Sequence, residues 1–121
     1  DEVDYNLLSQ RTGIDVKSVS VIMQEPGNII PIHRDMFHMI KSNYDTEGKK
    51  IVRANIFLED WKSGHYLEFD KDPCTNWKAN EGFVISEEVT HLSANAGLEN
   101  KYTVQISGFY NDNKIHESPR Q

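Results

Sequence analysis

Short runs of β-branched and apolar residues, separated by turn-forming residues, recur along most of this chain. The runs alternate in polarity or end at Gly, Pro, Asn or Asp, which is typical of strands in antiparallel sheets. We expect seven strands at these positions: 18–24, 29–33, 51–60, 64–70, 83–87, 90–95 and 101–110. Many short strands with little helix predict a mainly all-β fold, either a sandwich or a jelly-roll barrel.

The segments outside these strands carry weaker signals. A polar N-terminal stretch has room for a short helix around Tyr5–Gln10, and we expect 36–50 and 71–82 to be connections. The predicted organisation is an N-terminal segment, a jelly-roll core and a mobile C-terminal tail, with bounds 1–17, 18–110 and 111–121.

Length and charge limit the classes of function. A chain of 121 residues has room for one domain. Its 13 basic and 19 acidic residues give a net charge of −6, which argues against nucleic-acid and anionic-membrane partners. A single cysteine, Cys74, excludes an internal disulfide and favours a cytoplasmic location. The chain begins at Asp1 without methionine, as expected of a trimmed fragment, and no feature of it indicates an oligomeric state.

His33 and Asp35 lie two residues apart at the end of an apolar strand, in the stretch "IIPIHRD". Residues i and i+2 of a strand share a face, so both side chains can reach one point. Such a pair occurs often by chance, but His91 on a later strand adds a second imidazole. Two histidines and one carboxylate are the ligands of a facial triad that holds Fe(II), and zinc can use the same set.

The last predicted strand carries a possible anion receptor. Lys101 and Thr103 share one face of this strand, where a cation beside a hydroxyl could bind the far carboxylate of a dicarboxylic acid. A solvated lysine at the start of a strand is the alternative interpretation of Lys101.

Arg53 and Asn55 share a face of the strand "IVRANIFL" and are candidate substrate-binding residues. They could bind a substrate carboxylate or the cosubstrate, and an outward, solvated pair is equally compatible with the pattern. His38 and His65 are further imidazoles whose roles the sequence leaves open.

The joint pattern of H-x-D, a distal His and a basic residue followed by Thr resembles the Fe(II)/2-oxoglutarate-dependent dioxygenases. "SGHYLEF" is similar to the Gly-x-x-Leu-x-Phe strand of that superfamily, and "NWKANEGFVIS" to the stretch before its distal histidine. "HLSANAGLENKYTVQISGFY" resembles its C-terminal motif, so the resemblance covers roughly 18–110. Lysine at 101 is similar to prolyl-hydroxylase-like members, and "IVRANIFLED" resembles the aspartyl/asparaginyl-hydroxylase-like branch.

The resemblance implies a double-stranded β-helix in which His33, Asp35 and His91 bind Fe(II). It implies that 2-oxoglutarate chelates the iron and pairs its far carboxylate with Lys101 and Thr103. With O2 as the second cosubstrate, the expected reaction is hydroxylation of an unactivated C–H bond, releasing succinate and CO2. The substrate, peptidyl or a small molecule, is not indicated by the sequence.

Members of that superfamily usually carry N-terminal helices that brace the sheet, and this chain has little room for them.

Two alternatives to a dioxygenase of this superfamily remain open. "HLSAN" also matches the His-x-x-x-Asn part of a cupin motif, which would suit a cupin-like metal-binding isomerase. The first cupin motif calls for His-x-His, however, whereas this chain has His33 and Asp35. A jelly roll that binds a partner without catalysis, and retains no metal, is the second alternative.

Overall fold

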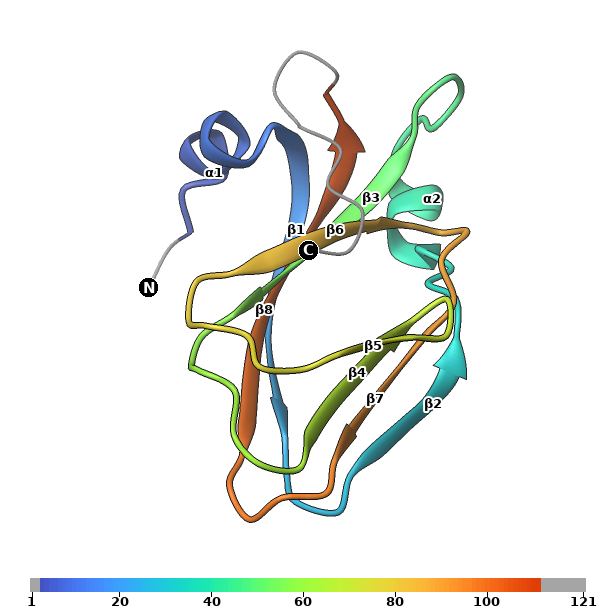
Figure 1. Ribbon diagram of the computed structural model, residues 1–121. Coiled ribbons are helices and arrows are strands. Elements are labelled where there is room, and N and C mark those ends of the chain that lie inside the picture. The colour runs from blue at the N-terminus through green and yellow to red at the C-terminus, as the bar shows by residue number, and fades with distance from the viewer. Residues whose placement is uncertain (1–2, 112–121) are drawn as a thin grey trace.

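The computed structural model describes residues 3–111, which form a mainly β structure (Figure 1). In chain order its elements are α1 (Tyr5–Thr12), β1 (Ile14–Gln24), β2 (Ile29–His33), α2 (His38–Asn43), β3 (Ile51–Phe57), β4 (His65–Phe69), β5 (Asp72–Cys74), β6 (Gly82–Ser86), β7 (His91–Asn95) and β8 (Lys101–Tyr110). Neither of these two helices has the length and apolar character needed to cross a membrane.

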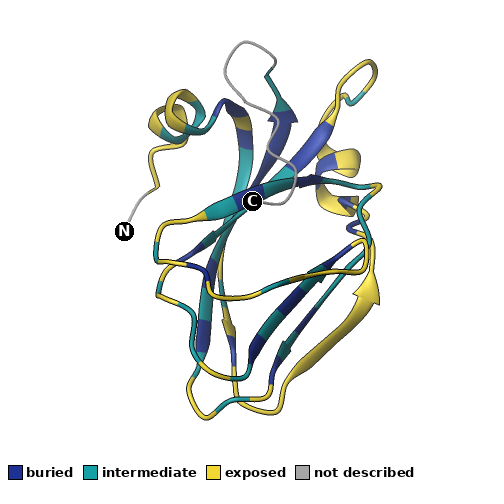
Figure 2. Ribbon diagram, in the orientation of Figure 1, coloured by how far each residue is buried: buried dark blue, intermediate teal, exposed yellow. Residues whose placement is uncertain are grey.

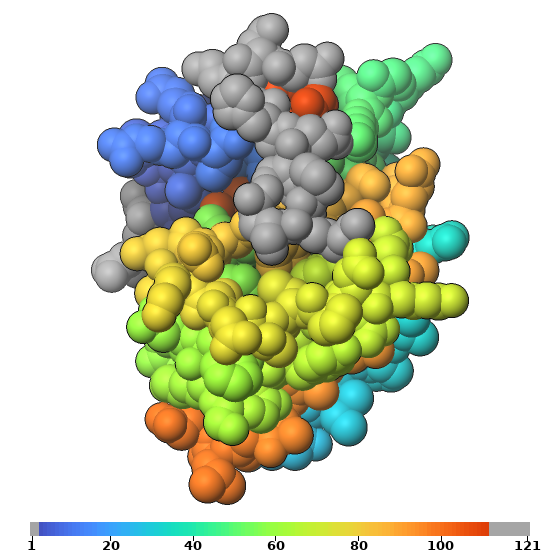
Figure 3. Space-filling view, in the orientation of Figure 1, coloured from blue at the N-terminus to red at the C-terminus, as the bar shows by residue number. Residues whose placement is uncertain are grey.

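The strands form two four-stranded antiparallel sheets, with orders β1-β8-β3-β6 and β2-β7-β4-β5. Strands near the two ends of the chain are neighbours in both sheets, so the chain winds between the sheets as a double-stranded β-helix (Figure 1). The predicted all-β jelly-roll class is confirmed. In Figure 3 the segment from β4 towards β6, yellow-green to yellow, forms a band across the middle of the visible face.

The outer face of the first sheet packs partly against α1. Alternating residues of β1, β3 and β8 form an apolar cluster there, and Leu8 of α1 packs on it. The helix is short but has both end signals: Asp4 accepts a hydrogen bond from the Leu7 amide at 3.0 Å, and Gly13 adopts a left-handed φ of 74°. The left-handed conformation of Gly13 ends α1 directly before β1 begins.

The inward-facing residues of β3 show how the interior is divided. Ile51, at one end of β3, packs in a cluster with α2, and Phe57, at the other end, belongs to an aromatic cluster. The Phe57 and Trp77 rings stack with centroids 4.0 Å apart. Between these two apolar ends, β3 places Arg53 and Asn55 against a cavity. The two apolar clusters therefore lie on either side of the polar residues of β3 that face the cavity. Figure 2 shows that all residues of β2, at the edge of the second sheet, are classed as exposed, while the other strands carry most of the buried residues.

Three local predictions were wrong. β1 begins at Ile14 rather than at residue 18, because β8 is long enough to pair with it as far as Tyr110, across a bulge between Val16 and Ser18. The predicted boundary after residue 17 therefore falls inside a strand. The expected connection 36–50 contains α2, and the expected loop 71–82 contains β5, which pairs with β4. Apart from Asn111, the predicted C-terminal tail lies outside the described residues.

Candidate metal centre

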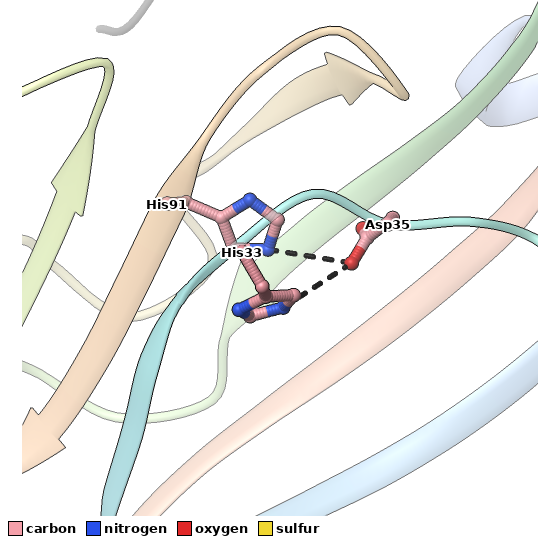
Figure 4. Close-up of side chains that lie close together, drawn as sticks. All are labelled: His33, Asp35 and His91. Carbon is pink, nitrogen blue, oxygen red and sulfur yellow. Dashed lines mark ion pairs between the residues drawn. The ribbon is translucent and has the colours of Figure 1, made fainter.

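Three side chains from two parts of the chain, residues 33–35 and residue 91, converge (Figure 4) and line the cavity. His33 ends β2, His91 begins β7, and the two are paired in the register of the second sheet. Asp35 follows two residues after β2, where the chain has left the sheet. One ligand atom from each residue lies within 4.8 Å of the other two, so this group could hold a metal ion.

Backbone carbonyls orient both imidazoles. His33 Nδ1 lies 2.8 Å from the Pro31 carbonyl oxygen, and His91 Nδ1 lies 3.2 Å from that of Val89. A carbonyl oxygen only accepts, so we assign the ring proton to Nδ1 in each histidine, which leaves a lone pair on each Nε2. Metal-binding histidines are oriented in this way, with the nitrogen that does not bind metal donating to an acceptor.

Both Nε2 atoms face the same carboxylate oxygen. Oδ1 of Asp35 lies 3.5 Å from His33 Nε2 and 3.3 Å from His91 Nε2 (Figure 4). With the protons on Nδ1, three acceptor atoms point at one another and lack a donor between them. A divalent cation satisfies all three atoms at once, so the residues present fit a metal of the zinc or iron type.

Asp35 is held as a carboxylate. It is 8% exposed, and Arg53 Nη1 lies 3.1 Å from its other oxygen, Oδ2. That contact is an ion pair, because Oδ2 forms no hydrogen bond of regular geometry with the described residues. Burial alone raises the pKa of Asp35, but its contact with His91 and the positive charge of Arg53 outweigh burial and lower the pKa below its ordinary value. The group is therefore ionised at neutral pH.

The cavity beside the triad has a volume of about 250 Å³. Its walls differ: Leu67, Phe69 and Phe83 form an apolar wall, and polar side chains from β1, β3, β7 and β8 form the other. Side chains of both kinds in one small cavity suit a ligand that has a charged end and an apolar body.

Lys101 and Thr103 line the polar wall of the same cavity, and both are 6% exposed. Lys101 Nζ donates to Ser93 Oγ over 3.4 Å and lies 5.8 Å from the centre of the Trp77 ring. No carboxylate among residues 3–111 forms an ion pair with it. Burial lowers the pKa of Lys101 to about 8, against a smaller opposing effect of Cys74. The structure thus brings into the triad's cavity a buried cation that has no anionic partner within the described part of the chain.

Arg53 and Asn55 also line the cavity, so the outward alternative for this pair is wrong. Asn55 Oδ1 accepts a hydrogen bond of 3.1 Å from Gln105 Nε2, while Arg53 is engaged by Asp35. Sequence reasoning missed Gln105, although the period of a strand places it on the same face of β8 as Lys101 and Thr103.

Gln24 and Ser93 were missed as well. Ser93 Oγ donates to Gln24 Oε1 over 2.7 Å, and both residues line the cavity. Gln24 pairs with Lys101 in the register of β1 and β8, a cross-strand relation that sequence spacing does not reveal.

The remaining histidines and the cysteine stand apart from the triad. His38 is exposed at the start of α2. His65 is buried with its Nε2 2.9 Å from the Glu99 carbonyl oxygen, a structural role at the far end of the barrel from α2. Burial raises the pKa of the Cys74 thiol, which keeps it protonated and weakly nucleophilic at neutral pH.

Comparison with known proteins supports the fold. No family model and no curated protein matches the sequence. A non-heme monooxygenase, ThoJ, in its nickel complex is similar in structure, with a TM-score of 0.59 and 14% identity over 76% of this chain and 42% of that one. A predicted oxalate decarboxylase from Thermotoga maritima gives a TM-score of 0.56 and 8% identity over 88% of this chain and 75% of that one.

A cupin protein from Bacteroides fragilis gives a TM-score of 0.51 and 13% identity over 84% of this chain and 70% of that one. At these identities the likeness shows the fold, which is that of the cupins and other double-stranded β-helix proteins. This chain spans less than half the length of the monooxygenase, and the activities of these proteins are their own.

Proposed function

We propose that this protein is an Fe(II)- and 2-oxoglutarate-dependent dioxygenase that hydroxylates an unactivated C–H bond and releases succinate and CO2. In this proposal His33, Asp35 and His91 hold the iron, and Lys101 and Thr103 bind the far carboxylate of 2-oxoglutarate. One observation carries it: one cavity of about 250 Å³ is lined by a triad of converging acceptor atoms and by a buried lysine that no carboxylate of residues 3–111 pairs with. Bound iron with 2-oxoglutarate and O2 would supply the oxidising chemistry.

The residues of the triad contribute charge and geometry. Two neutral imidazoles and one carboxylate present a single negative charge to a divalent cation and occupy one side of it. The backbone contacts of the two Nδ1 atoms hold both rings in place, which lowers the conformational cost of binding.

Lys101 and Thr103 would orient the cosubstrate. The Lys101 ammonium has three donors, of which Ser93 Oγ accepts one over a long distance, so donors remain for a carboxylate. A charge-assisted hydrogen bond is strong where water is excluded, and Lys101 is nearly fully buried. The ammonium would therefore fix the end of the cosubstrate that lies away from the metal.

The rest of the cavity suits an uncharged part of the target. Leu67, Phe69 and Phe83 offer apolar contact, and the Asn55–Gln105 amide pair offers a donor and an acceptor. These side chains would hold the reacting carbon and exclude water. We leave the target at the level of a peptidyl or small-molecule substrate.

The proposal can be tested without the substrate. Fe(II) and 2-oxoglutarate are added to the protein without oxygen, and the visible charge-transfer band of the chelate is recorded. We expect a band in the wild type and in His38→Ala, whose histidine is exposed and outside the triad, and its loss in His91→Ala. A folded wild-type protein that binds Fe(II) but gives no band with 2-oxoglutarate would refute the cosubstrate assignment.

The fold comparisons favour a second candidate, a cupin-type metal enzyme that acts without 2-oxoglutarate. A predicted oxalate decarboxylase shares the fold, and Lys101 could bind the carboxylate of a substrate acid directly. This candidate predicts metal binding and a response to short dicarboxylic acids in place of 2-oxoglutarate. A non-catalytic binding module would show neither.

A further inference from the structure

Arg53 lies directly behind the carboxylate of the triad. Its Nη1 is 3.1 Å from Asp35 Oδ2, the oxygen that faces away from the two histidines. The histidine nitrogens approach the other oxygen, Oδ1, at 3.3 and 3.5 Å. The two oxygens of one carboxylate are thus divided between a protein cation and the candidate metal position.

The guanidinium of Arg53 is fixed from a second side. Its Nε donates a 2.8 Å hydrogen bond to Ser107 Oγ, and Ser107 is 1% exposed. Arg53 and Ser107 are opposite each other in the β3–β8 register, so two central strands of the first sheet set this contact. A planar group bonded through Nε and paired through Nη1 has little freedom to turn.

Arg53 also contacts the segment that carries Asp35 at another point. Its guanidinium lies 5.0 Å from the centre of the Phe37 ring, two residues after Asp35. Phe37 has φ 53° and ψ 41°, a left-handed conformation that is unfavourable for a residue with a bulky side chain. Its buried ring packs with Ile40 and Phe109, which holds this conformation in place.

We propose that Arg53 is a positioning residue that holds Asp35 as a one-oxygen ligand for the metal. By engaging Oδ2, the guanidinium leaves Oδ1 alone to face the histidines, and the Phe37 contact keeps the 34–37 segment from turning outward. A carboxylate that binds through one oxygen leaves more coordination positions open for other ligands. This inference rests on the proposed metal centre and replaces the substrate-binding role expected for Arg53.

Metal binding without cosubstrate gives the direct test. Co(II) serves as the probe, because its visible spectrum reports both affinity and ligand geometry. The variants are Arg53→Met, Arg53→Lys and Ser107→Ala, and Arg34→Met is the matched control, an exposed arginine between the two ligands. Unfolding of each metal-free variant is followed in parallel.

We expect Arg53→Met to weaken Co(II) affinity about 10- to 100-fold, as for other residues that orient metal ligands. Its spectrum should change, because Asp35 becomes free to bind through both oxygens. Ser107→Ala should shift the affinity in the same direction by a smaller factor. Arg53→Lys should recover part of the lost affinity, since lysine restores the positive charge but not the planar guanidinium with its several donors. The Co(II) affinity of Arg34→Met should stay within about twofold of the wild type.

Three outcomes would overturn the inference. Wild-type affinity and spectrum in Arg53→Met would show that Asp35 needs no support. Normal Co(II) binding in Arg53→Met, with binding lost when 2-oxoglutarate is then titrated onto the Co(II)-loaded variant, would assign Arg53 to the cosubstrate. A wild-type protein that binds no Co(II) would remove the metal centre and this role with it. If Arg53→Met does not fold, Arg53→Lys and Ser107→Ala decide the question by the same two readouts.

Discussion

Two buried charges face the same cavity and have opposite surroundings. Asp35 has the guanidinium of Arg53 at 3.1 Å, so a positive charge of the protein itself matches its negative charge. Lys101 has a serine hydroxyl at 3.4 Å, and no carboxylate among the described residues pairs with it. The carboxylate of Asp35 thus has its counter-charge before any ligand arrives, whereas residues 3–111 provide none for Lys101.

This difference indicates where ligand binding would act on stability. A buried cation without an anion destabilises the folded state, because water solvates the charge better in the unfolded chain. A carboxylate that binds Lys101 would relieve that cost. A metal at the triad would instead add to a centre whose side chains are already oriented.

The largest effect is expected for the carboxylate of the triad. Asp35→Asn keeps the shape but removes the charge, and we expect it to weaken metal affinity by about 1,000-fold, since a metal ligand contributes roughly 3–4 kcal/mol. Co(II) titration measures the loss, with the exposed Asp45→Asn as the matched control. Wild-type affinity in Asp35→Asn would remove Asp35 from the ligand set.

The next effect concerns stability and its pH dependence. Burial lowers the pKa of Lys101 from 10.5 to about 8, so between these values the unfolded state binds more protons and the stability of the folded state rises with pH. The shift corresponds to about 3 kcal/mol, a cost fully present below pH 8 and lost as the pH approaches 10.5.

Lys101→Met removes this cost. The metal-free variant should be more stable than the wild type by up to about 3 kcal/mol at pH 7, with the gap closing towards pH 10.5. Urea unfolding at a series of pH values measures it, with the partly exposed Lys62→Met as the control. A difference in the free energy of unfolding that stays constant across this pH range would mean that another group pairs with Lys101 and keeps it charged.

A smaller effect is expected on ligand binding, where loss of Lys101 should affect 2-oxoglutarate but not the metal. Lys101→Met should weaken 2-oxoglutarate binding about 10- to 100-fold, the range expected when one charged hydrogen bond is lost, and leave Co(II) affinity nearly unchanged. Calorimetric titration of the Co(II)-loaded protein checks both quantities. Equal losses for metal and cosubstrate would show that the two centres are one coupled unit.

The parts of the fold predicted from sequence are those that strand periodicity controls. Alternation along β3 and β8 predicted that Lys101 shares a face with Thr103 and Arg53 with Asn55, but it left open whether these faces point inward or outward, and the structure turns both towards the cavity. The helix α2 and the short strand β5 were missed, because each is too short to show a period and depends on contacts distant in sequence.

The candidate site also has a part that the sequence could predict and a part that it could not. Motif spacing predicted which residue types could meet, and the structure brings His33, Asp35 and His91 together. The contact of Arg53 with Asp35 could not be predicted, because it depends on the path of the chain after β2 and on the left-handed conformation of Phe37. A bulky residue in that conformation carries no sequence signal.

The pairing of His33 with His91 in one register has a consequence for folding kinetics. These residues lie on β2 and β7, so their contact closes a loop that includes most of the barrel. Contacts so distant in sequence form late, after the entropy of loop closure has been overcome. A metal that needs both imidazoles finds no site until the two strands have paired, so it would slow unfolding and leave the rate of folding almost unchanged. Bound metal would then increase the kinetic stability of the folded barrel.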